Sequence, residues 1–136
     1  MALSWWTYLS NHPATIGICT SKRGYTGTLI QDSNEFCLCI PNEQLKEAAF
    51  RCGTCSGRER SKSEEFGIAL KDSVRVKTKH VAKSALVMEC RLQNIIDVGD
   101  HNFYIAEVLE CYADPTVHPL FALDGYRRLD TVATEK

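Results

Sequence analysis

Two segments in the second half of the chain alternate apolar and polar residues, as half-buried strands do: 84–92 and 101–111. Between them lies Gly99-Asp100, which suits a two-residue turn because glycine accepts the positive φ at the first position. Residues 84–112 therefore predict one long hairpin. The residues expected to share a face are Leu86, Met88, Cys90 and Leu92 on the first strand, and Phe103, Ile105, Leu109 and Cys111 on the second.

The first half of the chain mixes short strands with short helices. Residues 14–19 and 36–40 predict strands, and Phe36, Leu38 and Ile40 should share one face. Thr26 can N-cap a short helix that follows it. The tail from Asp114 onward shows no strong period.

The clearest predicted helix follows Asn42, which can cap it, and ends at Gly53 in a left-handed conformation. Its apolar residues recur at helical spacing and predict one buried stripe, formed by Leu45, Ala48, Ala49 and Cys52. Together these segments predict a mainly antiparallel β domain with two or three short helices, and a small barrel is the simplest way for its sheet to close.

Composition narrows the class of protein. The chain has 136 residues, which suits one domain, residues 1–136, and its net charge of −1 gives no general attraction to nucleic acid or to acidic membranes. No apolar run approaches the roughly 20 residues that span a bilayer. The N-terminus lacks a basic secretory signal, so we expect the seven cysteines to be free thiols in a cytoplasmic protein.

Two cysteine pairs, Cys37-x-Cys39 and Cys52-x-x-Cys55, could be counted as four zinc ligands. The spacing argues against it, because a zinc knuckle usually has C-x-x-C twice and the helix stripe uses Cys52 for packing. A redox dithiol would need its C-x-x-C at the start of a helix, whereas this one follows a helix end. We therefore expect no metal, and cysteines that act as small apolar residues.

Two clusters of cations carry the strongest candidate chemistry. One contains Lys22 and Arg23, and the other joins Ser56 and Gly57 to three basic residues, Arg58, Arg60 and Lys62. Charge, hydroxyls and free backbone N–H groups together suit a phosphate monoester. A pair of solvated basic turns is the competing interpretation, and composition alone favours it. Motifs for nucleoside triphosphates, for Rossmann dinucleotides and for hydrolases are absent from the sequence.

Aromatic residues gather near the N-terminus, at Trp5, Trp6 and Tyr8. They could form a buried or interface strand, or a wall for a flat ring. His101 opens a strand directly after the predicted tight turn, so its ring could point into the mouth of a site or simply into solvent. The other histidines, His12, His80 and His118, are expected in loops or at the surface.

Four segments in order resemble the flavin reductase-like, FMN-binding split-barrel family, and within it the flavoredoxin branch. They are "ALSWWTYLSNHPATIGIC", "KRGYTGTLIQDSNEFCLCIP", "CGTCSGRERSK" and "VGDHNFYIAEVLEC", and they cover most of residues 2–112. The resemblance implies a six-stranded antiparallel Greek-key barrel with short helices that works as a homodimer. Because Met1 falls almost on the first segment, the barrel could lack an N-terminal strand.

The resemblance also implies a site for FMN at the dimer interface. Leu3, Ser4 and Trp5 would lie along the ribityl chain and ring, and His101 would lie near the flavin and the nicotinamide entry. The phosphate end would be formed by Arg23, Tyr25, Thr26, Ser56, Gly57 and Lys62. Cys55 has no place in this set, and no protein nucleophile is required.

The implied activity is hydride transfer between NADH or NADPH and flavin. An alternative is a flavoredoxin-like carrier that passes electrons from bound FMN to a redox protein, with little NAD(P)H turnover. A second alternative is a shortened barrel that no longer binds flavin.

Overall fold

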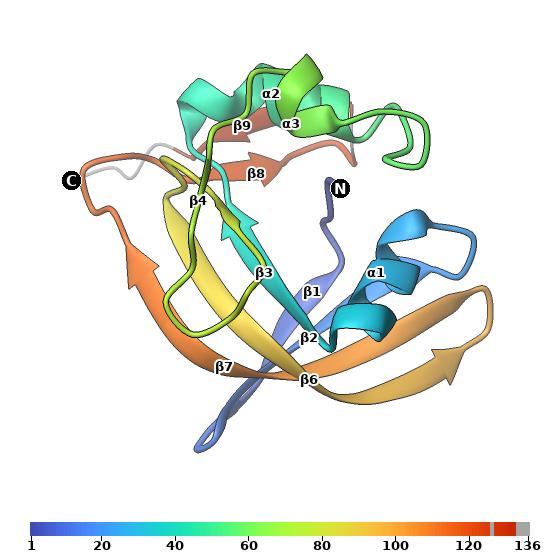
Figure 1. Ribbon diagram of the computed structural model, residues 1–136. Helices are drawn as coiled ribbons and strands as arrows, with labels where there is room; N and C mark the ends of the chain where they lie inside the picture. Colours follow the sequence, from blue (N-terminus) through green and yellow to red (C-terminus); the bar gives the residue numbers. More distant parts are fainter. Residues whose placement is uncertain (126, 133–136) are drawn as a thin grey trace.

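The structure, a computed structural model, describes residues 1–125 and 127–132. Its main element is a five-stranded antiparallel sheet in the order β1-β2-β7-β6-β3, and two pairs of short strands, β4-β5 and β8-β9, accompany it (Figure 1). The bounds of the strands are β1 Trp6–Asn11, β2 Ala14–Ser21, β3 Glu35–Ile40, β4 Leu70–Lys71, β5 His80–Val81, β6 Leu86–Val98, β7 His101–Ala113, β8 Leu120–Ala122 and β9 Leu129–Thr131.

The predicted class, mainly β and antiparallel with short helices, is confirmed. The main sheet has five strands where the resemblance implied six in a barrel. The β8-β9 pair lies in the tail, where no period was visible, because strands of three residues are too short to show an alternation.

The long hairpin is confirmed and organises the sheet. Strands β6 and β7 pair from Leu86↔Ala113 to Val98↔His101, and Gly99 at the turn has φ of 85°. Because β7 pairs with β2 and β6 pairs with β3, the hairpin lies between the two halves of the N-terminal region. Figure 1 shows the two long strands crossing the lower part of the molecule.

The apolar face predicted for β6 is the face that packs in the core, whereas the core face of β7 is formed by residues other than those predicted to share a face. Met88 and Cys90 are buried in the core, but on β7 the buried residues are Tyr104 and Ala106. Phe103 packs on the other face against Gly17, where an added Cβ would lie 2.1 Å from the ring. Apolar residues occupy both faces of β7, so alternation alone could not choose between them.

Helix α1 (Tyr25–Ser33) follows β2, and its start differs from the prediction. Gly24 is the N-cap residue, and no side chain caps the helix, so Thr26 as the cap is wrong. Thr26 lies inside the first turn. The helix ends at Asn34, whose φ of 58° places it in the left-handed region.

The predicted helix after Asn42 begins as a short 3-10 turn, η1 (Glu43–Leu45), and continues as α2 (Lys46–Cys52). Asn42 caps it as expected, with its side-chain oxygen accepting from the backbone N–H of Gln44 at 2.8 Å. The left-handed end at Gly53 is wrong, because its φ is −80° and its N–H donates to the carbonyl of Phe50.

The apolar stripe of this helix exists, but its four residues are only half-buried, because they face a cavity rather than a filled core. Helix α3 (Lys62–Glu65) follows the loop 53–61 and lies beside α2 above the sheet (Figure 1). No helix in the part of the chain that the structure describes is long and apolar enough to cross a membrane.

The loop 72–79 is held from below by a carboxylate that sequence reasoning missed. Glu89 is 0% exposed and accepts from the backbone N–H groups of Val74, Arg75 and Val76 at 3.0, 2.6 and 3.3 Å. The hydroxyl of Tyr112 donates to it at 2.9 Å. Burial acts to raise the pKa of Glu89, but these hydrogen bonds outweigh burial and lower it. The group is therefore an ionised anchor for the loop.

His80 belongs to the same network, and its expected place at the surface is wrong. It lies in β5 with only 8% of its surface exposed, and its Nδ1 is 2.9 Å from the Tyr112 hydroxyl. Burial, followed by the nearby Glu89, raises the pKa of Tyr112 well above its usual range. The polar ring of His80 can be buried because it has a hydrogen-bond partner inside the protein.

Candidate functional site

The first part of the candidate site is the start of α1, where the turn 21–24 leaves β2. The backbone N–H of Arg23 donates to the Ser21 hydroxyl at 3.2 Å, and that of Gly24 donates to the Ser21 carbonyl at 3.1 Å. This turn ends the strand and starts a helix that has no side-chain cap. The positive end of the helix dipole is thus available to an anion from outside the helix.

The loop 53–61 comes to this helix start from a distant part of the sequence. Arg58 donates from Nη1 to the Arg23 carbonyl at 3.1 Å, and its guanidinium lies 5.3 Å from the centre of the Tyr25 ring. Gly57 also packs there, since a Cβ added to it would meet Tyr25 at 3.6 Å. The two cation clusters of the sequence therefore meet at one helix N-terminus.

Ser56 and Lys62 shape this loop. The Ser56 hydroxyl accepts from the backbone N–H of Arg58 at 3.2 Å. Lys62 donates from Nζ to the carbonyl of Cys52 at 2.7 Å, which ties the two ends of the loop together. Arg60 instead pairs with Glu65 at 2.9 Å, away from the turn 21–24. Lys62 is thus a loop-closing residue in this structure, with two further N–H donors for a ligand.

The second part of the site is an aromatic stack. The rings of Trp5 and His101 are 4.8 Å apart between centroids and inclined by 27°. Trp5 is 60% exposed, so the stack is open to solvent. The backbone N–H of Cys19 donates to the Trp5 carbonyl at 2.9 Å, which fixes the N-terminal segment along β2. Trp6 and Tyr8 do lie in a strand, β1, and the use of Trp5 as a wall for a flat ring stays a prediction.

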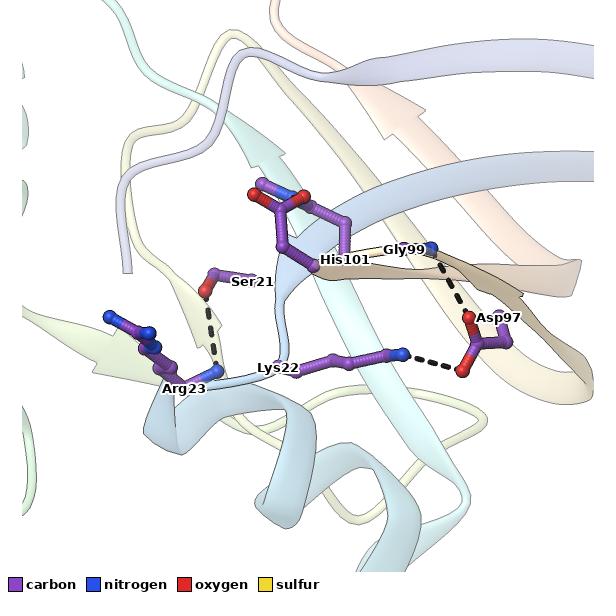
Figure 2. Close-up of polar contacts among 7 residues, drawn as sticks. Ser21, Lys22, Arg23, Asp97, Gly99 and His101 are labelled. Carbon is purple, nitrogen blue, oxygen red and sulfur yellow. Dashed lines mark hydrogen bonds and ion pairs between the residues drawn. The ribbon is translucent and has the colours of Figure 1, made fainter.

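Strand register brings the two parts together. In the pairing of β2 with β7, His101 is directly opposite Ser21, two residues before Arg23. The backbone N–H of Lys22 donates to the Asp100 carbonyl at 3.0 Å, and its ammonium pairs with Asp97. Figure 2 shows His101 above the turn that carries Ser21 and Arg23, with Lys22 reaching across to Asp97.

Asp100 orients the imidazole of His101. Its Oδ1 is 2.7 Å from His101 Nδ1, and the hydrogen bond from His101, aided by the charge of the imidazolium when protonated, lowers the pKa of Asp100. Asp97 likewise has a lowered pKa because Lys22 donates to it and Gly99 N–H adds a second hydrogen bond. With Nδ1 occupied by Asp100, Nε2 is the ring nitrogen left for a ligand.

The third part lies deeper. Leu3, Ser4 and Thr26 line a cavity between the sheet and the segments above it, together with Trp6 and Ile30. The chain thus runs from this cavity at residues 3–4 to the aromatic stack at Trp5. The ten residues expected at the site fall into three adjacent groups. Sequence reasoning omitted Arg58 and Asp100 from that set, although Arg58 was visible as one of the clustered cations.

The cysteines do not add a further site of their own. Among the described residues no group of three or more His, Cys, Asp or Glu side chains is placed to hold a metal ion, and all seven cysteines are free. Burial raises the pKa of Cys37 to about 11 and that of Cys90 to about 12. Cys55 is half-buried with its thiol 3.8 Å from the Arg51 carbonyl.

The family model described as "Flavin reductase like domain" matches residues 1–130. The chain belongs to the flavin reductase-like family. Two uncharacterised archaeal proteins are similar to this family member: one from Pyrococcus abyssi is 31% identical over 109 residues, and one from Archaeoglobus fulgidus is 29% identical over 109 residues. Each alignment covers 80% of this chain and 62% of the relative, so the chain spans about three-fifths of their length.

Solved structures of the family share the fold at low identity. Flavoredoxin of Desulfovibrio vulgaris has a TM-score of 0.90 at 20% identity, covering 100% of this chain and 79% of its own. An NADH:FAD oxidoreductase of Streptomyces globisporus has a TM-score of 0.86 at 17% identity, and the match covers 97% of this chain and 76% of that protein. An FMN-binding protein from Thermus thermophilus with bound p-hydroxybenzaldehyde has a TM-score of 0.87 at 18% identity, and the match covers 98% of this chain and 78% of that protein. At these identities the likeness shows the fold of this flavin reductase-like chain.

Proposed function

We propose that this protein binds FMN and transfers hydride equivalents between NADH or NADPH and flavin. The observation that carries the proposal is the meeting of an uncapped helix start, two arginines and an exposed aromatic stack within one strand register. Family membership and the similarity in fold to an NADH:FAD oxidoreductase and an FMN-binding protein support it.

The chemistry of the donor groups fits the phosphate of FMN. A phosphate monoester needs several N–H donors and positive charge, and the first turn of α1 offers both with Arg23 and Arg58 at its edge. The hydroxyls of Tyr25 and Ser56 and the ammonium of Lys62 lie on the same two segments. Arg58 and Lys62 each donate one hydrogen bond within the protein, and their further N–H groups and positive charge suit an anionic ligand better than a neutral one.

The remaining residues fit a flat ring and a ribityl chain. Trp5 and His101 offer a stacked, exposed aromatic surface of the kind that isoalloxazine uses, and Leu3 and Ser4 extend from it toward Thr26. FMN, when bound, would supply the hydride-accepting ring. The protein would contribute position and orientation, which hydride transfer requires. Nε2 of His101 would donate or accept a proton near the ring.

The decisive test begins with binding. The purified protein should be yellow or become so with added FMN, and ultrafiltration should retain one FMN per chain. A protein that stays colourless and leaves added FMN in the filtrate would refute the proposal and favour the barrel without flavin. Stopped-flow mixing with NADH and with NADPH then separates the activities. Rapid bleaching supports a reductase, whereas bleaching by dithionite alone would assign the carrier role and refute NAD(P)H turnover.

We also propose a homodimer. Its support is a set of exposed apolar side chains on β1 and at the far end of the β6-β7 hairpin, namely Tyr8, Leu9, Ile95, Ile96 and Val98. The two strands that carry these residues, β1 and β6, are separated by β2 and β7 in the sheet, and a second copy of the chain could cover exposed apolar side chains of this kind. Light scattering coupled to size exclusion should give twice the chain mass of 15.3 kDa, and the mass of one chain would refute the dimer.

A further inference from the structure

Helix α1, whose first turn is the candidate phosphate end, lies against the main sheet (Figure 1). Its buried residues are Gly27 and Ile30, which are three positions apart and therefore share one face of the helix. Ile30 packs in the hydrophobic core. Gly27 has no side chain, so the backbone of the first turn itself comes close to the sheet. The groups beneath Gly27 therefore set the height of the first turn above the sheet.

The Tyr104 hydroxyl lies directly beneath Gly27. A Cβ added at Gly27 would lie 2.6 Å from the hydroxyl oxygen of Tyr104, far inside an ordinary contact distance. The same Cβ would lie 3.7 Å from Cζ of Tyr104 and 3.7 Å from Oγ1 of Thr20, which are ordinary contacts. The overlap is therefore with the hydroxyl oxygen and not with the ring. A methyl group would fit at position 27 if that oxygen were absent.

The ring of Tyr104 is held in place by the core. Tyr104 is 1% exposed and belongs to the same cluster of buried residues as Ile16, Ile18 and Phe36. Because protein interiors are close-packed, a ring in this position has no free space into which it could turn. The helix would therefore move instead of the ring. Its first turn would rise by up to about 0.8 Å, the difference between 2.6 Å and an ordinary contact of 3.4 Å.

The height of this turn matters for a phosphate. Gly27 is the third residue of α1, so its backbone N–H is one of the first-turn donors that have no acceptor within the helix. Hydrogen bonds to an anion are short and weaken as the distance grows. Strand β7 carries Tyr104 and, three residues earlier, His101 of the aromatic stack. A raised helix would thus change the distance between the phosphate end and the ring end of the site.

We propose that Gly27 is a positioning residue for the flavin phosphate. Because it lacks a side chain, the first turn of α1 packs against the Tyr104 hydroxyl, and this contact sets the preference of the site for FMN over riboflavin. The inference rests on the proposed function, which assigns the phosphate to this turn. Without the contact, Gly27→Ala would favour the helix, since alanine is the best helix former and glycine one of the poorest.

The test compares the unmodified chain with Gly27→Ala, Tyr104→Phe and the double variant, using fluorescence quenching to measure the dissociation constants of FMN and riboflavin. Gly27→Ala should weaken FMN binding by about 10-fold or more, because a small misplacement of donors is costly. Its affinity for riboflavin should stay unchanged. Tyr104→Phe should change neither constant, since Gln31, which donates to the Tyr104 hydroxyl at 3.3 Å, is exposed and can donate to water instead. The double variant should recover FMN binding, because the added Cβ would then meet Cζ at 3.7 Å.

Thr28→Ala is the control, because Thr28 is the next residue of α1 and is exposed. It should leave both dissociation constants unchanged. Equal losses of FMN and riboflavin binding in Gly27→Ala, or no recovery in the double variant, would overturn the role of Gly27. If Gly27→Ala does not fold, the double variant decides. It must then fold and bind FMN as Tyr104→Phe does, and failure to do so would overturn the role.

Thermal unfolding without flavin supplies a second measurement. Gly27→Ala should lower the Tm of the unmodified chain but not that of Tyr104→Phe, and an equal decrease in both would overturn the contact. The outcomes also separate this role from the proposed function. FMN binding that is insensitive to Gly27→Ala would refute the role of Gly27 alone. An unmodified chain that leaves FMN unbound would refute the proposed function and this role together.

Discussion

The indole of Trp5 stacks on the imidazole of His101 with their centroids 4.8 Å apart, although these residues lie far apart in a sequence of 136 residues. One comes from the segment before β1 and the other from the first residue of β7. The stack is an exposed aromatic surface, and the imidazole of His101 is held by the Asp100 carboxylate at 2.7 Å.

Replacing Trp5 with Leu should weaken FMN binding by about 3- to 10-fold, because an aromatic pair contributes roughly 0.5–1.5 kcal/mol beyond its buried area. Fluorescence quenching of FMN measures the dissociation constant. Phe50→Leu is the matched control, since Phe50 is an exposed aromatic residue on α2 outside the stack. If both variants bind FMN equally well, Trp5 does not contact the ring.

Arg58→Ala should weaken FMN binding by about 10- to 100-fold, since a charge-assisted hydrogen bond to phosphate contributes roughly 1.5–3 kcal/mol. Arg60→Ala is the control from the same loop, because Arg60 pairs with Glu65 rather than with the turn 21–24. Riboflavin, which lacks the phosphate, should bind both variants alike. A similar loss of riboflavin binding in Arg58→Ala would mean that the loop, not the phosphate contact, was disturbed.

Glu89→Ala should lower the free energy of unfolding by at least about 3 kcal/mol, because three backbone N–H groups and the Tyr112 hydroxyl would lose their acceptor. Urea unfolding followed by fluorescence measures the change. Glu64→Ala, at an exposed position in α3, should change it by less than about 0.5 kcal/mol. A small effect at Glu89 would contradict its role as the anchor of loop 72–79.

The same carboxylate predicts a direction for the response to acid. The pKa of Glu89 is lower in the folded chain than its ordinary value of 4.5, so its contribution to stability is complete above about pH 4.5. That contribution is lost as the pH falls from there through the folded pKa. The difference in stability between the unmodified chain and Glu89→Gln should therefore shrink between pH 5 and pH 3. A difference that stays constant over this range would show that the charge is not responsible.

Gly17→Ala should destabilise the fold by about 1–3 kcal/mol, because the added methyl would overlap the Phe103 ring. Phe103→Leu in the same chain should recover part of that loss by making room. A double-mutant cycle measured by thermal unfolding gives the coupling energy. Additive effects of the two substitutions would mean that the ring moves aside without cost.

The sequence predicted those features that depend on local chemistry. Gly99 and Asn42 are recognisable because a tight turn and a helix cap each select a residue type at one position. The face of β7 could not be chosen, since Phe103 and Tyr104 are both apolar enough for a core. The choice depends on Gly17, a residue distant in sequence that accepts Phe103 on the outer face.

The candidate site shows the same division. The two cation clusters were visible in the sequence as residue types. The contact of Arg58 with the Arg23 carbonyl could not be predicted, because it depends on how the loop 53–61 folds over α1. Glu89 left no signal at all. Its strand neighbours predict a surface carboxylate, and only the loop laid over it by the tertiary fold makes it a buried acceptor.

The register that places His101 opposite Ser21 joins residues separated by most of the chain. Contacts of such long range close large loops and therefore tend to form late and slowly during folding. The turn 21–24 and the stack on Trp5 acquire their relative positions only when β7 has docked on β2. Recovery of FMN binding during refolding should therefore lag behind the recovery of helix α1. The binding of FMN would then report when the sheet is complete.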